Sequence, residues 1–413
     1  MSDLVRLQVA SLGAQGDGVV PGPDGPGYVP FALPGESVLV EVTGERGRLV
    51  AVERPSPDRV AAQCRHFTSC GGCRMQHLAR PAYEAWKREL VLQAFAARGI
   101  ADPRLGELIT VASGERRRAA LSARRTAGGV VLGFHEECGT AIVDLAECPV
   151  TSPAIVAALP GLRRLLEPVL PHSGEARVRV TVATQGLDVT IEGLPEKLSA
   201  PHRAGLARAA QELRLVRLAS GGDLIFAVAR PTVRLGGVEV AIPDGAFLQA
   251  AQSAEQAMAT RVVAAVGKAR RIADLYCGCG TFTFALAGRA PVLDVDSSHD
   301  ANAALAEAAR HAKGLKRIEP RVRDLARDPL SRKELEGFDA VVVDPPRAGA
   351  RAQAEALGRS GVAKVVLISC NAATLARDAR ILLNAGYELQ SVIPVDQFLF
   401  SPHVEIISVL HRM

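Results

Sequence analysis

Four cysteines in the N-terminal part of the chain have the residue type and spacing of metal ligands. Cys64, Cys70 and Cys73 follow the pattern Cys-x5-Cys-x2-Cys, and Cys148 stands further along the chain, followed by a proline. Thiolates are ligands for zinc and for iron–sulfur clusters. Zinc sites more often combine two Cys-x2-Cys pairs, and this chain has one. The spacing leaves zinc and an iron–sulfur cluster both open, with Cys138 as a rival for the fourth ligand position.

A thiol and a carboxyl near the C-terminus have the types needed for covalent catalysis. Cys370 follows an apolar stretch at 364–369 that we expect to be a strand, and a helical stretch follows it. Because a helix N-terminus stabilises a thiolate, we predict that Cys370 is a nucleophile rather than an inert buried thiol. Glu405 enters the apolar run 404–407. Partial desolvation there would suit a general base.

A glycine-rich loop and an aspartate predict a cofactor site. Gly278 and Gly280 lie where a strand feeds a helix, so they permit a tight turn and a close approach of the backbone to a ligand. The third glycine of a dinucleotide fingerprint is missing. Asp296 ends the next strand and can accept hydrogen bonds from both ribose hydroxyls, which favours S-adenosylmethionine over NAD. Asp324, after the third strand, is a candidate for binding the adenine amino group, with helix capping as the alternative.

A turn with two prolines, Asp344-Pro345-Pro346-Arg347, follows another apolar strand in the same crevice. Proline fixes the backbone and removes N–H groups, so carbonyl oxygens remain as acceptors. Methyltransferases that act on amino groups use a similar turn with an aromatic residue after the prolines. Arg347 occupies that place here, which disfavours stacking of an exocyclic amine.

The elements that must position these residues change in character along the chain. Residues 1–58 read as short strands separated by glycine-rich turns, which predicts a small OB-like β-barrel. Residues 59–252 contain the cysteines, a helix expected at 81–98 and hairpins expected at 119–134, 177–191 and 224–240. We therefore predict a central α+β domain there.

From residue 253 onward, strands and helices alternate, which predicts an α/β doubly wound sheet with ligands at the carboxyl ends of its strands. A capping box at 253–256 predicts a helix that reaches about Val266. Further helices are expected at 300–313 and 374–385. The expected strands are 271–276, 292–296, 317–322, 340–344, 364–369, 389–395 and 404–410.

The positive charge of the chain is concentrated in one segment. The net charge is +5, but residues 59–135 alone carry +8 and residues 1–58 carry −4. Clustered arginines, densest at 116–118 and 124–125, are the footprint expected for nucleic-acid binding, and a solvated basic face is the alternative. No apolar run approaches the ~18 residues of a membrane helix. Eight cysteines and the absence of a signal-peptide pattern predict a reducing, cytoplasmic location.

Taken together, the motifs resemble those of the RNA uracil-5-carbon methyltransferase family over nearly the whole chain. The elements that carry the resemblance are Ser369 to Asp378, Asp344 to Arg347, Asp274 to Gly280, Phe247-Leu248-Gln249, His403-Val404-Glu405 and the cysteine set. The family transfers a methyl group from S-adenosylmethionine to C5 of a uridine. Cys370 would attack C6 of the uracil, and Glu405 would remove the C5 proton.

The resemblance also implies binding residues and an architecture. The cofactor and active-site positions would be Gln249, Tyr276, Thr281, Asp296, Asp324 and Asp344, of which Asp344 is an alternative contact of the uracil. The ligands of a [4Fe–4S] cluster would be Cys64, Cys70, Cys73 and Cys148. The multidomain fold would comprise a TRAM-type barrel at 1–58, a central domain with the cluster and the RNA-binding segment at 59–252, and a class I methyltransferase domain at 253–413.

The RNA substrate implied by the resemblance is 23S rRNA, with tRNA as the alternative. Because the barrel is acidic, we expect the basic segment 59–135 to grip the RNA. We expect neither a membrane nor an obligate protein partner. Two other functions are weighed. A non-catalytic RNA-binding or assembly factor on the same scaffold would not need Cys370 and Glu405, and an amino-group methyltransferase would not need a thiol.

Overall fold

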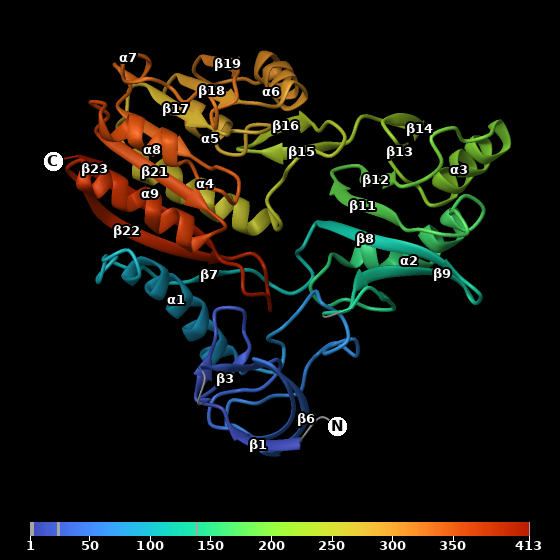
Figure 1. Ribbon diagram of the computed structural model, residues 1–413. Coiled ribbons are helices and arrows are strands. Elements are labelled where there is room, and N and C mark those ends of the chain that lie inside the picture. Colours follow the sequence, from blue (N-terminus) through green and yellow to red (C-terminus); the bar gives the residue numbers. More distant parts are fainter. Residues whose placement is uncertain (1–3, 23–24, 138, 413) are drawn as a thin grey trace.

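The computed structural model describes residues 4–22, 25–137 and 139–412. It consists of a curled N-terminal sheet, a central sheet domain and a large C-terminal sheet flanked by helices (Figure 1). Cys138, the rival for the fourth ligand position, lies outside the described residues. Among the helices of the described part, none is long and apolar enough to cross a membrane.

The N-terminal body is a six-stranded sheet that curls on itself (Figure 1). Its strands are β1 (Leu4–Gln8), β2 (Ser11–Leu12), β3 (Gly18–Val20), β4 (Gly27–Val29), β5 (Ser37–Thr43) and β6 (Arg46–Arg54). The order β1-β5-β6-β4-β3-β2 begins and ends with strands that are consecutive in the sequence, which requires the sheet to curl. Among the described residues, the edge strands β1 and β2 are not paired with each other. The sheet therefore does not close, and the expected barrel is a half-barrel.

The central domain is a seven-stranded sheet with two helices packed against it and against each other. Its strands are β8 (Arg118–Thr126), β9 (Gly129–His135), β10 (Ile142–Asp144), β11 (Ala176–Ala183), β12 (Gly186–Glu192), β13 (Arg217–Ser220) and β14 (Asp223–Ala227), and its helices are α2 (Pro153–Leu166) and α3 (Ala200–Glu212). The first two predicted hairpins are confirmed. The third is wrong in extent, because β14 pairs with β13. The strands β15 (Thr232–Leu235) and β16 (Val238–Ala241) form a separate two-stranded sheet.

The C-terminal sheet has eight strands in the order β19-β18-β17-β20-β21-β23-β22-β7. Its strands are β7 (Ile109–Thr110), β17 (Ile272–Leu275), β18 (Val292–Asp296), β19 (Ile318–Val322), β20 (Ala340–Val343), β21 (Lys364–Ser369), β22 (Tyr387–Asp396) and β23 (Glu405–Arg412). Its helices are α4 (Gln252–Val266), α5 (Thr283–Ala287), α6 (His299–His311), α7 (Arg332–Leu335), α8 (Arg351–Gly358) and α9 (Ala372–Asn384). The seven predicted strands are confirmed to within two residues at each end.

Both faces of this sheet are buried, because successive side chains of its central strands pack into two different hydrophobic clusters. Val341 and Val343 of β20 belong to one hydrophobic cluster, which includes residues of α8 and α9. Val342 lies in a second cluster, which includes residues of α4 and α5. Successive side chains of a strand point to opposite faces, so helices cover both sides. The predicted doubly wound arrangement is thereby confirmed, with the antiparallel β23 making the sheet mixed.

Two segments pack across the boundaries expected from the sequence. Helix α1 (Arg80–Ala96) contacts α9 and β22 rather than the central sheet, and β7 pairs with β22. The β15–β16 sheet packs against the glycine-rich loop and α6. These contacts cross the expected boundary at residue 252, and α1 also touches the N-terminal body through Tyr83 and Trp86, which pack with Leu33.

The predicted capping box of α4 is wrong. The helix begins at Gln252, and its N-cap residue Ala251 makes no side-chain cap. The Ser253 hydroxyl instead donates to the Glu115 carboxylate. Glu255 is buried in an ion pair with Arg117, which joins the central domain to the C-terminal sheet. A tertiary contact has thus taken the Ser253 hydroxyl that was expected to cap the helix.

Candidate active site

Five predicted site residues stand at the carboxyl ends of five neighbouring parallel strands. The strands β19, β18, β17, β20 and β21 lie side by side in that order. The residues at or just after their ends are, in the same order, Asp324, Asp296, Tyr276, Asp344 and Cys370. Adjacent strands are about 4.8 Å apart, so Asp296 and Cys370 are separated by roughly 14 Å across the sheet. This edge can hold an extended ligand with its two ends in different environments.

The glycine-rich loop is fastened to Asp296. One carboxylate oxygen of Asp296 accepts from the Gly278 N–H at 2.9 Å, and the other accepts from the Ser298 N–H at 2.7 Å. Gly280 has φ +98°, and a Cβ there would lie 2.6 Å from the Phe284 ring. The turn therefore requires glycine at this position. Each oxygen of Asp296 keeps a further lone pair for a ligand hydroxyl.

Tyr276 and Thr281 line the same loop. Tyr276 adopts φ +62°, and its backbone N–H donates to the Val295 carbonyl at 2.8 Å. Burial, with a smaller contribution from the charge of Asp324, raises the pKa of Tyr276 to about 12, so the phenol remains a donor. Thr281 is buried, whereas Asp324 is exposed. Asp324 accepts from the Ala326 N–H at 3.0 Å within the turn at 325–327, so this contact stabilises a turn, and neither the adenine contact nor a helix cap is settled by it.

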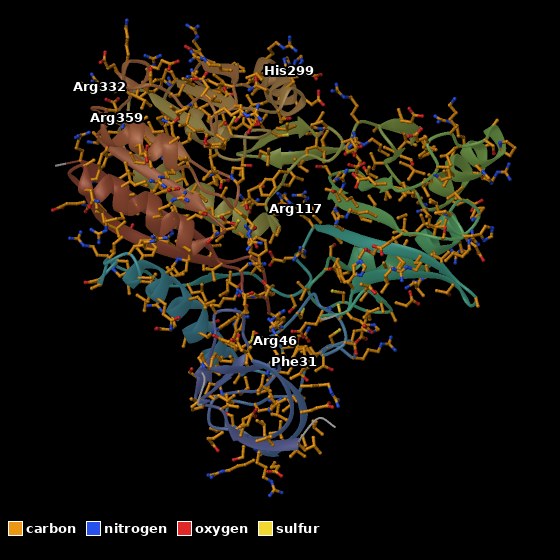
Figure 2. The ribbon with its side chains drawn as sticks, viewed as in Figure 1. Phe31, Arg46, Arg117, His299, Arg332 and Arg359 are labelled. Carbon is orange, nitrogen blue, oxygen red and sulfur yellow. The ribbon has the colours of Figure 1, made fainter. Side chains whose placement is uncertain are left out.

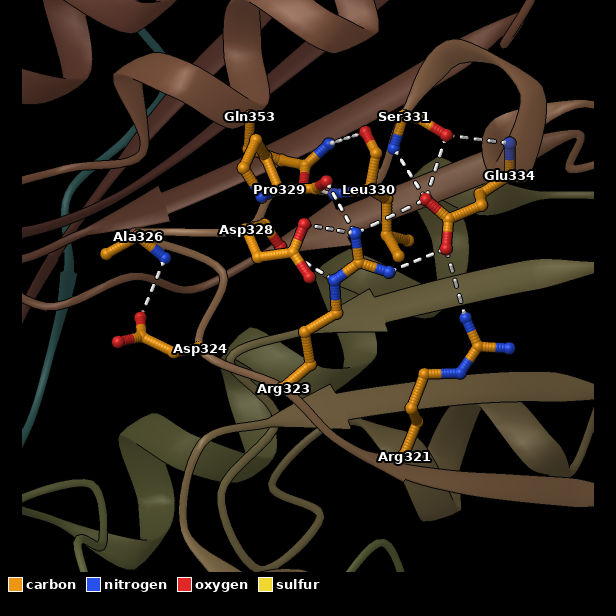
Figure 3. A network of polar contacts seen from close by, with 10 residues as sticks. All are labelled: Arg321, Arg323, Asp324, Ala326, Asp328, Pro329, Leu330, Ser331, Glu334 and Gln353. Carbon is orange, nitrogen blue, oxygen red and sulfur yellow. Dashed lines mark hydrogen bonds and ion pairs between the residues drawn. The ribbon is translucent and has the colours of Figure 1, made fainter.

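A dense polar network holds the segment that follows Asp324 (Figure 3). The Arg323 guanidinium donates to the Asp328 carbonyl at 2.7 Å, to the Pro329 carbonyl at 2.9 Å and to the Glu334 carboxylate at 2.6 Å. The hydrogen bond from Arg323 lowers the pKa of Glu334 to about 2. Arg323 therefore fixes the turn in which Asp324 stands, and no sequence motif indicated this role.

Cys370 lies between β21 and α9, as predicted, but another side chain binds the N-terminal N–H groups of the helix. The Asn371 side chain caps α9 by accepting from the N–H groups of Ala373 and Thr374, so the helix terminus is already occupied. Burial, followed by the charge of Glu405, raises the pKa of Cys370 to about 11. Burial and the neighbouring carboxyl thus oppose a thiolate at Cys370, and its role as the nucleophile stays a prediction.

Glu405 is brought to the same edge by the antiparallel strand β23. Ser369, at the end of β21, pairs with Ile406, so the preceding Glu405 lies beside Cys370. Burial raises the pKa of Glu405 to about 7. Burial, together with the charge of Glu405, also raises the pKa of Asp344 well above its usual value. The two carboxyls therefore share one poorly solvated site next to a thiol.

Two glutamine amides connect these carboxyls. The Gln249 amide nitrogen donates to Asp344 at 3.2 Å. The Gln397 amide nitrogen donates to the Gln249 oxygen at 2.6 Å and to Glu405 at 2.9 Å. Gln249 was expected at this site, but sequence analysis missed Gln397. The available signal was a polar residue two positions after the expected strand at 389–395.

The comparisons with known proteins agree with this geometry. A model of the family described as tRNA (Uracil-5-)-methyltransferase matches residues 237–413. A protein of Agrobacterium fabrum, named as an uncharacterized RNA methyltransferase, is 44% identical and covers 98% of this chain and 99% of its own. The 23S rRNA (uracil(1939)-C(5))-methyltransferase of Methylococcus capsulatus is 33% identical and covers 93% of this chain and 92% of its own. The chain belongs to the RNA uracil-C5 methyltransferase family.

The crystal structure of the tRNA (uracil-54, C5)-methyltransferase of Pyrococcus abyssi, in complex with S-adenosyl-L-homocysteine, has the same overall architecture. It superposes with a TM-score of 0.77 at 25% identity, over 98% of this chain and 99% of its own. The protein is thus an S-adenosylmethionine-dependent RNA (uracil-C5)-methyltransferase.

In this methyltransferase, a buried triad braces the segment between β22 and β23. The Lys87 ammonium lies 2.8 Å from the Asp396 carboxylate, and both side chains are fully buried. The Tyr83 hydroxyl donates to the other Asp396 oxygen at 2.5 Å and accepts from the Phe400 N–H at 2.9 Å. The triad therefore ties α1 to the segment that leads into Glu405. Sequence analysis missed it, although Tyr83 and Lys87 are one helical turn apart.

The four predicted metal ligands of the methyltransferase line one cavity of about 450 Å³. Burial and the neighbouring thiols raise the pKa of Cys73 to about 12. No group of three or more His, Cys, Asp or Glu residues in the described ranges is arranged to hold a single metal ion. A cluster of several irons is larger than one ion, so its thiolates need not converge on one point. The four thiols and their shared cavity are compatible with such a cluster.

Arg117, one of the arginines at 116–118, lies between the central domain and the methyltransferase sheet, where it donates to the Gln249 carbonyl and pairs with Glu255 (Figure 2). Arg118 lies over the exposed Phe247 ring at 5.3 Å and shares a cavity of about 240 Å³ with Arg116 and Gln249. Burial, followed by the charges of neighbouring arginines, lowers the pKa of Arg118 to about 10. Within the described residues, neither Arg116 nor Arg118 forms an ion pair. This cavity therefore offers cationic groups to an anionic ligand next to Gln249.

Proposed function

We propose that the protein methylates C5 of a specific uridine in RNA through a covalent bond between Cys370 and C6 of the uracil. Attack of the thiolate on C6 makes C5 nucleophilic, and C5 then takes the methyl group from S-adenosylmethionine. Glu405 removes the C5 proton. The electrons of the C5–H bond form the C5–C6 double bond, and Cys370 leaves as a thiolate. The position of Cys370 beside Glu405 on adjoining antiparallel strands carries this proposal.

The cofactor is proposed to lie along the strand ends, with its adenosine near β18 and β19 and its methyl group near β20 and β21. Asp296 would accept from the ribose hydroxyls, and Asp324 from the adenine amino group. Asp344 would lie at the methyl end or against the uracil. The complete set of cofactor and active-site residues is Gln249, Tyr276, Thr281, Asp296, Asp324 and Asp344.

Cys64, Cys70, Cys73 and Cys148 are proposed as the ligands of a [4Fe–4S] cluster that braces the structure and takes no part in methyl transfer. The N–H groups of Arg74 and Met75, which follow Cys73, donate to the Phe400 carbonyl at 2.7 and 3.1 Å. His403 and Arg116 line the cysteine cavity. Loss of the metal would therefore disturb the cavity lined by Arg116 and Arg118, here called the basic cavity. It would also disturb the segment that leads to Glu405.

The proposed substrate is 23S rRNA. Its support is the relative from Methylococcus capsulatus, which is named for that RNA and aligns along most of this chain. The archaeal protein of the same architecture is named for tRNA, which makes tRNA the second candidate. In either case the RNA would be gripped at the basic cavity, since phosphates are attracted to arginines without carboxylate partners.

Cellular RNA that contains 5-fluorouridine tests the chemistry and the substrate together. Fluorine at C5 cannot leave as a proton, so the adduct with Cys370 should persist after methyl transfer. We expect a shifted band on a denaturing gel with the anaerobically purified protein and S-adenosylmethionine, and no band with Cys370→Ala. Sequencing the attached RNA distinguishes rRNA from tRNA. If no band forms although the cofactor binds, the non-catalytic RNA-binding role would be favoured.

Chelation tests the proposed cluster. Metal analysis of the anaerobically purified protein should find four irons per chain. Removal of the iron should weaken RNA binding before it weakens cofactor binding, because the cavity adjoins Arg116 and lies apart from the glycine-rich loop. Iron-free protein that retains its full affinity for RNA would contradict the bracing role.

A further inference from the structure

We propose that Gln397 is a positioning residue that holds the Glu405 carboxylate in the orientation needed to remove the C5 proton. The inference rests on the proposed function of Glu405 and adds a residue that none of the motifs indicated. It is drawn from the hydrogen bonds around one buried side chain, which is 2% exposed.

The orientation of the Gln397 amide is fixed by a backbone group. Its Oε1 atom lies 2.8 Å from the Ala250 N–H, which can only donate. The oxygen must therefore face Ala250, and Nε2 must face the other two partners, Glu405 and Gln249. Both N–H bonds of Gln397 are used, one to each partner. The side chain has no unsatisfied polar atom and no second arrangement of equal quality.

The direction of the next amide follows from the first. Since Gln397 donates to Oε1 of Gln249, the Gln249 nitrogen faces Asp344 and donates to it at 3.2 Å. Each carboxyl of the site thus receives one amide N–H from the same chain of hydrogen bonds. A hydrogen bond to the charged form favours that form, so Gln397 opposes the rise in the pKa of Glu405 that burial causes.

Gln397 is itself held in place by the two residues that precede it. Val395 pairs with Glu405 across β22 and β23, so residues 395–397 run beside the base. Asp396 is anchored by Lys87 and Tyr83. With this support, the Gln397 side chain can hold the Glu405 carboxylate in one orientation throughout the reaction.

The other titratable groups that face Glu405 are Asp344 at the end of β20 and Cys370 at the end of β21. Both become anionic with rising pH and both disfavour a charged Glu405. The positive charge of Arg347 lowers the pKa of Cys370 and so favours its thiolate. Gln397 is the described side chain that donates to Glu405, so its removal should shift the titration of the base toward higher pH.

Gln397→Met tests the proposal in the full-length protein, with natural RNA and S-adenosylmethionine. Methyl transfer to C5 should still occur, but removal of the C5 proton should slow. The methylated adduct should then accumulate on a denaturing gel, and kcat should fall on the order of tenfold to a hundredfold, the range for a lost hydrogen bond to a charged group. The KM for S-adenosylmethionine should stay unchanged, and the pH at half-maximal kcat should rise.

Gln185→Met is the matched control, because that amide also makes two hydrogen bonds, both to Thr232 at the start of β15 and away from Glu405. It should show neither the adduct nor the shift in pH. Gln397→Glu keeps the length of the side chain but cannot donate when ionised, so it should also accumulate the adduct if Gln397→Met fails to fold. The proposal for Gln397 alone would be overturned if Gln397→Glu had the adduct level and pH profile of the wild type while Glu405→Gln accumulated the methylated adduct. Normal turnover of Glu405→Gln would overturn the assignment of Glu405 and this proposal with it.

Discussion

Glu405 begins β23 beside the end of β21, after which Cys370 stands. The pairing of Ser369 with Ile406 sets this relationship, because antiparallel strands place the end of one next to the start of the other. A sheet of parallel strands alone would carry Glu405 to the opposite edge. Because β23 is antiparallel, its first residue, the base Glu405, lies at the edge where the parallel strands end.

Removing the ammonium of Lys87 should destabilise the fold. Lys87→Met leaves the Asp396 carboxylate fully buried without its cation, which typically costs about 3–5 kcal/mol. The free energy of unfolding by urea would measure this cost. Lys87→Met combined with Asp396→Asn should recover part of it, because no charge is then left unpaired.

The control for Lys87 is Arg230→Met. Arg230 pairs with Glu307 on the surface, and its side chain is 70% exposed. Exposed pairs contribute about 0–1 kcal/mol, so this variant should unfold close to the wild type. Equal stability of Lys87→Met and Arg230→Met would show that α1 does not brace the segment before Glu405.

Stability should depend on pH through Glu405. Its pKa in the folded protein is about 7, above the usual 4.5 of a glutamate, so the unfolded chain releases this proton first as pH rises. The free energy of unfolding should therefore fall between about pH 4.5 and 7. Glu405→Gln should remove this component and be the more stable protein at pH 8, by up to about 3 kcal/mol. Urea unfolding of both proteins from pH 4.5 to 8.5 would measure the difference, and parallel curves would contradict it.

The arrangement of strand-end residues could be predicted from the sequence, whereas the contacts that tune them could not. Alternation of strands and helices places Asp296, Asp344 and Cys370 at one edge, because parallel strands share their carboxyl ends. Gln397 and Lys87 depend on contacts between α1, β22 and β23. Those contacts follow from tertiary packing between distant parts of the sequence, so no local pattern reveals them.

The same limit applies to local electrostatics. The helix after Cys370 was correctly expected, but its N-terminal N–H groups are bound by Asn371. Two carboxyls, Asp344 and Glu405, come from other strands and act against a thiolate. The capping box at Ser253 failed for a similar reason, since Glu115 from another segment binds its hydroxyl.

Binding of S-adenosylmethionine should weaken when the network in Figure 3 is opened. Arg323→Ala removes the donors that fix the turn after Asp324, so the proposed contact to adenine loses its support. We expect the Kd to rise about tenfold, which corresponds to about 1.4 kcal/mol. Calorimetry with S-adenosylhomocysteine would measure it. Arg351→Ala, which breaks only an exposed pair with Glu355, is the control, and an equal Kd in both variants would contradict the role of Arg323.

RNA binding should lose salt dependence when the basic cavity loses a guanidinium. Arg118 faces this cavity without a carboxylate partner among the described residues, so we expect it to neutralise one phosphate. Arg118→Ala should weaken RNA binding roughly tenfold at low salt and reduce the slope of log K against log salt by about 1, because one fewer counterion is released. Fluorescence anisotropy with labelled RNA across a salt series would give both values. Arg270→Ala, whose side chain is 91% exposed on the C-terminal body, should leave the slope unchanged. If Arg118→Ala weakens binding without changing the slope, Arg118 does not neutralise a phosphate. It would then contact an RNA base beside the Phe247 ring, over which its guanidinium lies.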